Sequence, residues 1–229
     1  MVRNLFWKEW HEQRWKLGFG SIILMSFAAI SLRARLLPDE QVVFSVVEIA
    51  GLLLPVLVSM GLVAPERADG SLQSLRALPV SSRTIMAIKT AMGLLVTAAP
   101  VAAAAAVTCA IAGGREMGVA QILEMYARGM GMVLSLMLWM LAVGVELPTE
   151  ARAGLVGTGV LIIWLLVAGG LSRVDSAWPW TLCPFGFLQL STIEHTPSPV
   201  ATVVVQALIG AGLWRWAAWR LGQEPGRTV

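Results

Sequence analysis

The sequence predicts an all-α, polytopic membrane protein with about six transmembrane helices, an N-terminal interfacial helix, and cytoplasmic N- and C-termini. Composition is the first reason: of the 229 residues, 57% are hydrophobic and only 14% are charged, whereas an average soluble domain is roughly a quarter charged. The second reason is that the apolar residues form repeated runs of about twenty, the length that crosses a hydrocarbon layer about 30 Å thick. A soluble core needs no such runs, so this pattern argues against a very apolar soluble helical protein.

Residues 3–16 have the pattern of an amphipathic helix that lies in the membrane interface. With about 100° between successive residues, Phe6, Trp10 and Leu17 fall on one side of such a helix. The other side carries four charged residues, namely Lys8, Glu9, Glu12 and Lys16. Bulky aromatic residues opposite a charged face are typical of a helix at the level of the lipid headgroups. The alternative is a solvated segment that leads into the first span.

Six apolar segments follow, separated by polar connections. The predicted spans cover about residues 17–37, 42–64, 90–112, 120–145, 153–171 and 199–219. The longest polar stretch, residues 65–89, joins the second span to the third. Little of the chain remains to form a domain outside the bilayer, so we expect a single transmembrane domain over residues 1–229.

Residues 176–193 carry no charge, yet they do not have the pattern of a span. Trp178, Pro179, Trp180 and Pro184 all fall within this segment. A helix exposed to lipid cannot easily leave backbone groups unpaired, as the prolines would require. We therefore predict a re-entrant or interfacial segment with its tryptophans at headgroup depth, where this residue type is enriched.

The distribution of basic residues predicts the orientation. If the N-terminus is inside, only five of the 17 Lys and Arg residues fall on the outer side: Arg33, Arg35, Arg115, Arg128 and Arg173. Cytoplasmic connections of membrane proteins carry an excess of Lys and Arg. The sequence therefore predicts both termini in the cytoplasm, which agrees with an even number of spans.

Several function classes are excluded by missing motifs. No Gly-x-x-x-x-Gly-Lys-Ser/Thr sequence occurs, so this chain cannot hold ATP through a phosphate-binding loop. The two histidines, His11 and His195, are too far apart for an intramembrane metalloprotease motif. The net charge of +3 is spread in short clusters between apolar runs, which does not fit a nucleic-acid-binding face. We expect no enzyme activity, no bound cofactor and no nucleic-acid partner.

The connection between the second and third spans contains the most informative pattern. Gly70 and Ser71 can form a turn and a helix N-cap, and Leu72 and Leu75 then follow at about one-turn spacing, with Leu78-Pro79 close behind. A helix this short is not stable alone, but it fits a helix that seats in a groove on another protein. The alternative is a stiff loop that rests on the headgroups.

This pattern resembles that of the permease subunit of a type-two, exporter-like ABC transporter. That family has Glu-Arg after the second span, then Gly-Ser/Thr-Leu, a leucine turn, Leu-Pro-Val/Ile-Ser, a basic residue, and Lys at the entry to the third span. The matching residues here are Glu66, Arg67, Gly70, Ser71, Leu72, Leu75, Leu78, Pro79, Val80, Ser81, Arg83 and Lys89. The opening Trp7-Lys8-Glu9-Trp10 is similar to the interfacial helix of the family.

The resemblance implies a multi-pass protein of the bacterial cell membrane that exports a substrate. A dimer of separate ATPase subunits would bind ATP and magnesium and push on the coupling residues Glu66 to Pro79. A second permease, identical or paralogous, would face this chain within the lipid. The alternative is a membrane subunit that does not transport but anchors or senses for a multiprotein complex.

Two further sets of residues are candidates for function. Under the resemblance, the short link with Glu146, Glu150 and Arg152 would form a second, smaller contact with the ATPase. Glu48 lies in the second span, and Glu124 and Arg128 lie one turn apart early in the fourth. Because ionisable groups within spans are costly, they are candidates for a substrate path. The alternative is a solvated or ion-paired role near the outer interface.

Overall fold

The computed structural model describes residues 2–69, 80–115, 117–174, 176, 178–188 and 199–223. Its long helices are α1 (Val2–Arg33), α2 (Asp39–Met60), α5 (Ser82–Ala112), α6 (Val119–Glu146), α7 (Glu150–Leu171) and α9 (Pro199–Gln223). Three short elements complete the described ranges: α3 (Ala64–Ala68), α8 (Trp178–Leu182) and the 3-10 helix η1 (Pro184–Phe187). Six helices are long and apolar enough to cross a membrane, and the described ranges contain no strand. This confirms the prediction of an all-helical chain with six helices of membrane-spanning character.

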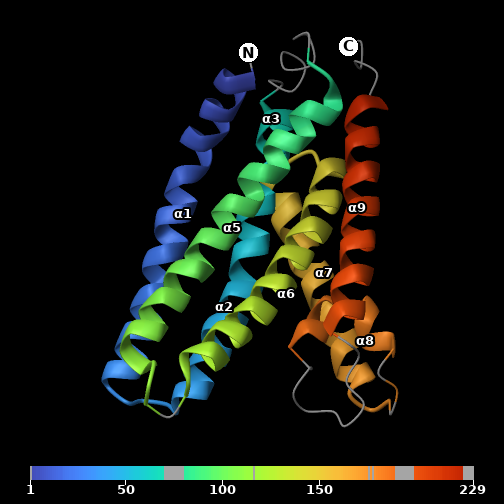
Figure 1. Cartoon of the computed structure of the whole chain (residues 1–229). Coiled ribbons are helices and arrows are strands. Elements are labelled where there is room, and N and C mark those ends of the chain that lie inside the picture. The colour runs from blue at the N-terminus through green and yellow to red at the C-terminus, as the bar shows by residue number, and fades with distance from the viewer. Residues whose placement is uncertain are drawn as a thin grey trace.

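The long helices run side by side along the molecule (Figure 1). The start of α1, the end of α9 and α3 all lie at one end, which we call the α3 end. The turn between α5 and α6 lies at the opposite end with α8, and we call this the α8 end. A chain that crosses an even number of times must begin and end at the same end, as this one does.

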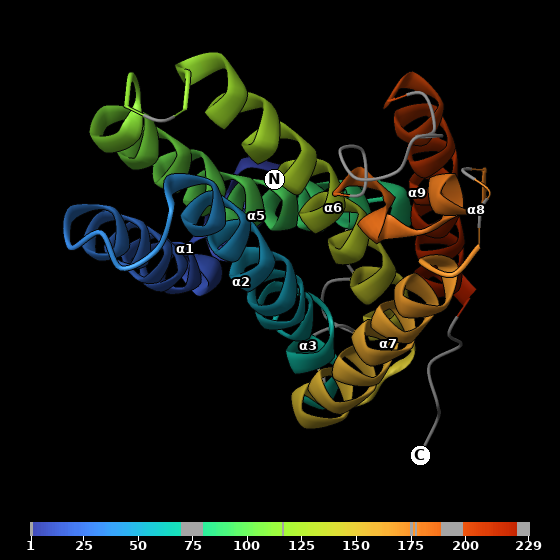
Figure 2. The ribbon, with the colours of Figure 1, turned by 90° about the horizontal axis from the view of Figure 1, so that it is seen from below.

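The central helices are α2, α5 and α6, and the others pack around them. Helix α1 packs along α5, α2 packs along α6, and α9 contacts both α5 and α6. Seen along the bundle, α6 lies between two groups of helices (Figure 2). Helices α1 and α5 lie on one side of it, and α7 and α9 lie on the other. Helix α7 leaves Leu155, Ile163 and Leu166 exposed. Apolar side chains arranged this way are stable against lipid rather than water.

The N-terminal helix differs from the prediction. One uninterrupted helix runs from Val2 to Arg33, so the structure does not support a separate interfacial helix over residues 3–16. On this helix Trp7 and Trp15 are exposed, while Glu9 and Gln13 are buried against the bundle. At 1.5 Å per residue the 32-residue helix is about 48 Å long, longer than a hydrocarbon layer of about 30 Å.

Helix α5 begins at Ser82, earlier than the expected start of the third span at residue 90. Ser81 caps it, because its Oγ accepts a hydrogen bond from the backbone N–H of Thr84 at 3.2 Å. The polar residues here had indicated a loop up to residue 89. Lys89 therefore lies well inside a helix, and it is buried.

The described part of the predicted re-entrant or interfacial segment forms α8 and η1, both folded against the bundle. Trp180 is completely buried and Phe187 lies against Gly131 of α6. Only Trp178 of the two tryptophans is exposed. Trp180 therefore packs within the protein, where the sequence had predicted a headgroup anchor, and residues 189–193 of the segment lie outside the described residues.

Candidate functional site

Four charged side chains meet inside the α3 end and form what we call the charge cluster: Lys8, Glu9, Glu66 and Lys89. The Nζ of Lys89 lies 2.6 Å from Oε1 of Glu9 and 2.8 Å from Oε2 of Glu66. Lys8 forms an ion pair with the other oxygen of Glu66. Exposure is 0% for Glu9, 1% for Lys89 and 4% for Glu66. Groups this charged are almost never fully buried unless they are paired, and here each one is.

The cluster also completes the end of α2. The last carbonyls of a helix have no partner within it, and cations are favourable near them. Lys89 donates a hydrogen bond to the carbonyl of Leu62 at 2.5 Å. Gln13 of α1 donates from Nε2 to the carbonyl of Gly61 at 2.6 Å. The polar side chains of α1 and α5 thus hold the end of α2 as well as α3.

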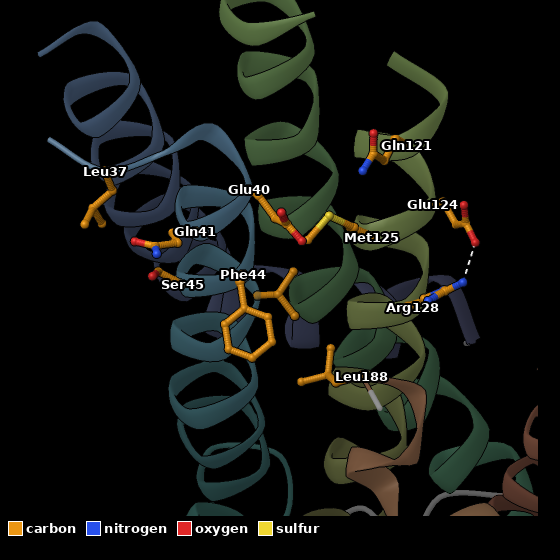
Figure 3. A pocket seen from close by; sticks show the side chains of 11 residues that line it. Leu37, Glu40, Gln41, Phe44, Ser45, Gln121, Glu124, Met125, Arg128 and Leu188 are labelled. Atoms are coloured by element: carbon orange, nitrogen blue, oxygen red, sulfur yellow. Dashed lines mark hydrogen bonds and ion pairs between the residues drawn. The ribbon is translucent and has the colours of Figure 1, made fainter. Parts of the chain in front are cut away.

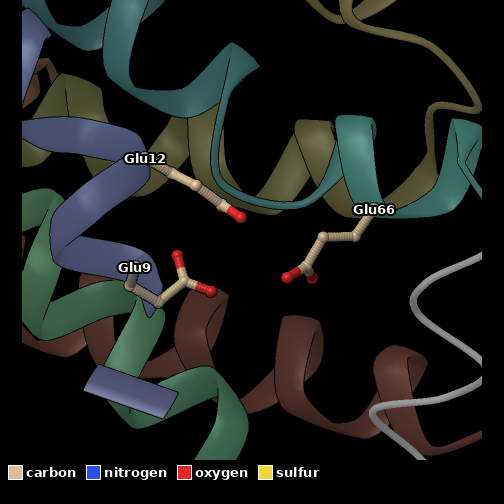
Figure 4. Close-up of side chains that lie close together, drawn as sticks. All are labelled: Glu9, Glu12 and Glu66. Carbon is tan, nitrogen blue, oxygen red and sulfur yellow. The ribbon is translucent and has the colours of Figure 1, made fainter. Parts of the chain in front are cut away.

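Three carboxylates converge at this point, as Figure 4 shows for Glu9 and Glu12 of α1 and Glu66 of α3. One oxygen of each lies within 4.8 Å of the others, a spacing that a metal ion could bridge. The ammonium groups of Lys8 and Lys89 already form ion pairs with these three carboxylates. A cation would have to displace both lysines, so the donor set fits an ion-pair cluster and not a metal centre.

The position of the cluster along the bundle is informative. Glu9 precedes Arg33, the end of α1, by about 36 Å at 1.5 Å per residue. This is slightly more than the thickness of the hydrocarbon layer, about 30 Å. The cluster therefore lies near the membrane boundary at the α3 end. It joins α1, α3 and α5 just before the chain enters residues 70–79.

The predicted coupling residues are only partly described. Glu66 lies in the charge cluster, so its side chain faces the bundle interior and is not on the surface. Arg67 lies in α3, and its side chain is outside the described residues. The remaining coupling residues also lie outside the described residues: Gly70, Ser71, Leu72, Leu75, Leu78 and Pro79. Contact of this loop with an ATPase stays a prediction.

The predicted second contact lies at the same end of the bundle. Glu146 ends α6 and forms an ion pair with Arg220 of α9, in which Nη2 of Arg220 lies 2.8 Å from Oε2. Glu150 begins α7, where Thr149 caps the helix by accepting from the N–H of Arg152. Helix α7 packs against α3. The fold thus places this link beside α3, the element that leads into the predicted coupling loop.

A groove at the α8 end contains two of the three residues predicted for a substrate path. It has a volume of about 650 Å³ and lies between the first turns of α2 and of α6 (Figure 3). Glu124 and Arg128 line it and form an ion pair at 2.5 Å, and Phe44, Met125 and Leu188 add apolar surface. Glu48 is exposed on α2 but does not line this groove.

The sequence interpretation missed Glu9 and Lys89 as partners. A signal was present, because Leu5, Glu9 and Gln13 recur every four residues and are buried like Leu24 and Ala28 further along α1. Read as one continuous helix, α1 would have placed Glu9 on its inward stripe. Its partner 80 positions away could not be identified from this spacing.

No protein-family model matches the chain, and no curated protein matches it either. The resemblance to ABC permeases therefore depends on the loop motif and the layout of the spans.

Proposed function

We propose that this chain is the membrane-spanning permease subunit of an ABC transporter, which exports a substrate with energy from a separate ATPase. The observation that carries the proposal is the charge cluster, which anchors α3 to α1 and α5. Helix α3 leads directly into the loop with the Gly70-Ser71-Leu72 motif. A subunit pushed through that loop needs a stiff connection from the loop to its spans.

The cluster supplies such a connection because its central residues are buried and form ion pairs with side chains from α1, α3 and α5. A displacement of α3 would act on Glu66, and through Lys89 and Lys8 on α5 and α1. The carbonyl of Leu62, held by Lys89, adds α2 to the same connection. Packed helices with ion-pair networks carry energetic coupling between distant sites. Nucleotide binding in the ATPase would then bias the arrangement of three spans at once.

The proposal includes partners that this chain requires. A dimer of ATPase subunits would bind ATP and magnesium and seat the loop in a groove, with Glu146, Glu150 and Arg152 as a second contact. A second permease, identical or paralogous, would complete the path through the membrane. The groove with Glu124 and Arg128 would open on the side opposite the ATPase.

The test is copurification of an ATPase from membranes of the native host, with Leu75→Asp as the diagnostic variant. An unpaired carboxylate buried in an apolar groove costs several kcal/mol, so we expect the contact to weaken about a hundredfold or more. Ser82→Asp is the matched control, because an acidic residue in the first turn of α5 is favourable for the helix. Expression and membrane insertion should survive both changes.

Two results would contradict the proposal. If Leu75→Asp retains the ATPase as well as the parent chain does, the loop is not the docking element. The anchor or sensor function would then be preferred. If the purified chain hydrolyses ATP without a partner, the separation into two subunits is wrong.

A further inference from the structure

A second cavity lies at the α3 end, between the start of α5 and the last turns of α9. Its volume is about 1050 Å³. Residues of α5 and the preceding turn form one wall: Ser81, Ser82 and Arg83. Residues of α9 form the other wall, among them Trp214, Arg215, Trp216 and Trp219. This basic cavity is separate from the charge cluster and from the groove at the α8 end.

The described lining of the basic cavity has charge of one sign. Of the lining residues that the structure describes, Arg83 and Arg215 are charged and none is a carboxylate. Neither arginine forms an ion pair with any residue in the part of the chain that the structure describes. Arg220, also on α9, is by contrast paired with Glu146. Two guanidinium groups thus line one cavity with no ion-pair partner among the described residues.

The surroundings indicate where an anion would come from. Trp216 and Trp219 are exposed near the end of α9, and tryptophans at the ends of spans lie at headgroup depth. Leu208 and Val204 continue an exposed apolar face along the same helix. The N-terminus of α5, a 31-residue helix, adds its positive dipole end to the same wall. A ligand here would meet cations at its head and apolar surface along its body.

We propose that the basic cavity binds an anionic phospholipid, with its phosphodiester between Arg83 and Arg215 and its acyl chains along α9. Guanidinium groups suit this headgroup because they can bind phosphate oxygens in pairs. Basic cavities between spans on the cytoplasmic side recognise anionic headgroups by the same chemistry. The bound lipid would link the start of α5 to the end of α9. This site does not depend on the proposed transport function.

The experiment measures binding of dioleoylphosphatidylglycerol to the purified full chain in detergent micelles by native mass spectrometry. The diagnostic variant is Arg83→Gln with Arg215→Gln. We expect about a twenty-five-fold loss of affinity, because each of the two basic residues near an anionic lipid contributes about fivefold. The matched control is Arg33→Gln with Arg35→Gln, two exposed arginines on the α8 side that change the net charge equally. Its affinity should equal that of the parent chain.

Two other probes separate the sources of the anion. Dioleoylphosphatidylethanolamine has the same tails without net charge and should bind the parent chain more weakly. Inorganic phosphate lacks the tails, and binding as tight as that of the lipid would show a soluble phosphate site and overturn the proposal. Equal loss in the diagnostic and control variants would overturn it too, because the effect would then be general charge. If the glutamine variant folds poorly, Arg83→Lys with Arg215→Lys provides a second test. This variant keeps both charges and should retain much of the parent chain's affinity for the lipid.

Discussion

The charge cluster at the α3 end and the Glu124–Arg128 pair at the α8 end both pair carboxylates with cations, but they differ in burial and in the helices that they join. Lys89, Glu9 and Glu66 come from three helices and are almost completely buried. Glu124 and Arg128 are neighbours on one helix, and their side chains are 60% and 26% exposed. A buried ion pair becomes strongly destabilising when one partner is lost, whereas an exposed pair contributes little. The charge cluster therefore positions helices, while the Glu124–Arg128 pair lines the groove, where a ligand can reach it.

The largest expected effect comes from removing the central cation. Lys89→Met leaves Glu9 and Glu66 facing each other inside the bundle with one ammonium fewer, which costs about 3–5 kcal/mol. We expect a clearly lower melting temperature of the purified protein in detergent. Adding Glu9→Gln to Lys89→Met should recover part of this loss, because it removes the carboxylate that Lys89 had neutralised, while Glu66 keeps its ion pair with Lys8. A melting temperature equal to that of the parent chain in Lys89→Met would show that the cluster does not hold the helices.

An intermediate effect is expected at the pair that joins α6 to α9. Glu146 and Arg220 are part-exposed, and the guanidinium donates to both carboxylate oxygens. Arg220→Gln should cost about 0.5–1 kcal/mol, the upper range for pairs that water can reach. The measurement is thermal unfolding at low and at high salt. The difference from the parent should shrink in high salt, since screening weakens exposed pairs more than buried ones. A loss as large as that of Lys89→Met would contradict this ranking.

The smallest effect on stability is expected in the groove. Arg128→Gln breaks a pair within one helix, which contributes about 0.3–0.5 kcal/mol. Unfolding should therefore be nearly unchanged. If the groove belongs to the substrate path, transport should fall although the variant folds normally. Loss of folding with Arg128→Gln would mean that the pair is structural and that the comparison between the two ends is wrong.

The candidate site was predictable only in part. The motif around Glu66 directed attention to α3, and Glu66 is part of the charge cluster. The interpretation assigned Glu66 to ATPase coupling, which stays a prediction, and placed Lys89 at the end of a loop, although it lies inside α5. Both missed the buried ion pairs of these residues for one reason. A charged residue next to an apolar run looks like the end of a membrane span. It can be placed inside the span only when the partner that neutralises its charge is known.

The sequence by itself determined that the chain is all helical and has six helices of membrane-spanning length. Runs of apolar residues are a local property, and lipid requires each run to satisfy its own backbone hydrogen bonds. Local pattern also identified two different faces on the first helix. It could not decide which face is inside, because in a membrane the apolar side can face lipid while the polar side packs inward.

Only the tertiary structure decided that orientation. Glu9 is directed inward because Lys89, 80 positions later, lies beside it. Lys8 likewise meets Glu66, 58 positions away. Pairing over such distances depends on how α1, α3 and α5 pack, and helix periodicity carries no information about it. The energy of a buried charge is set by its neighbours in space, which is why the charge cluster emerged only from the folded chain.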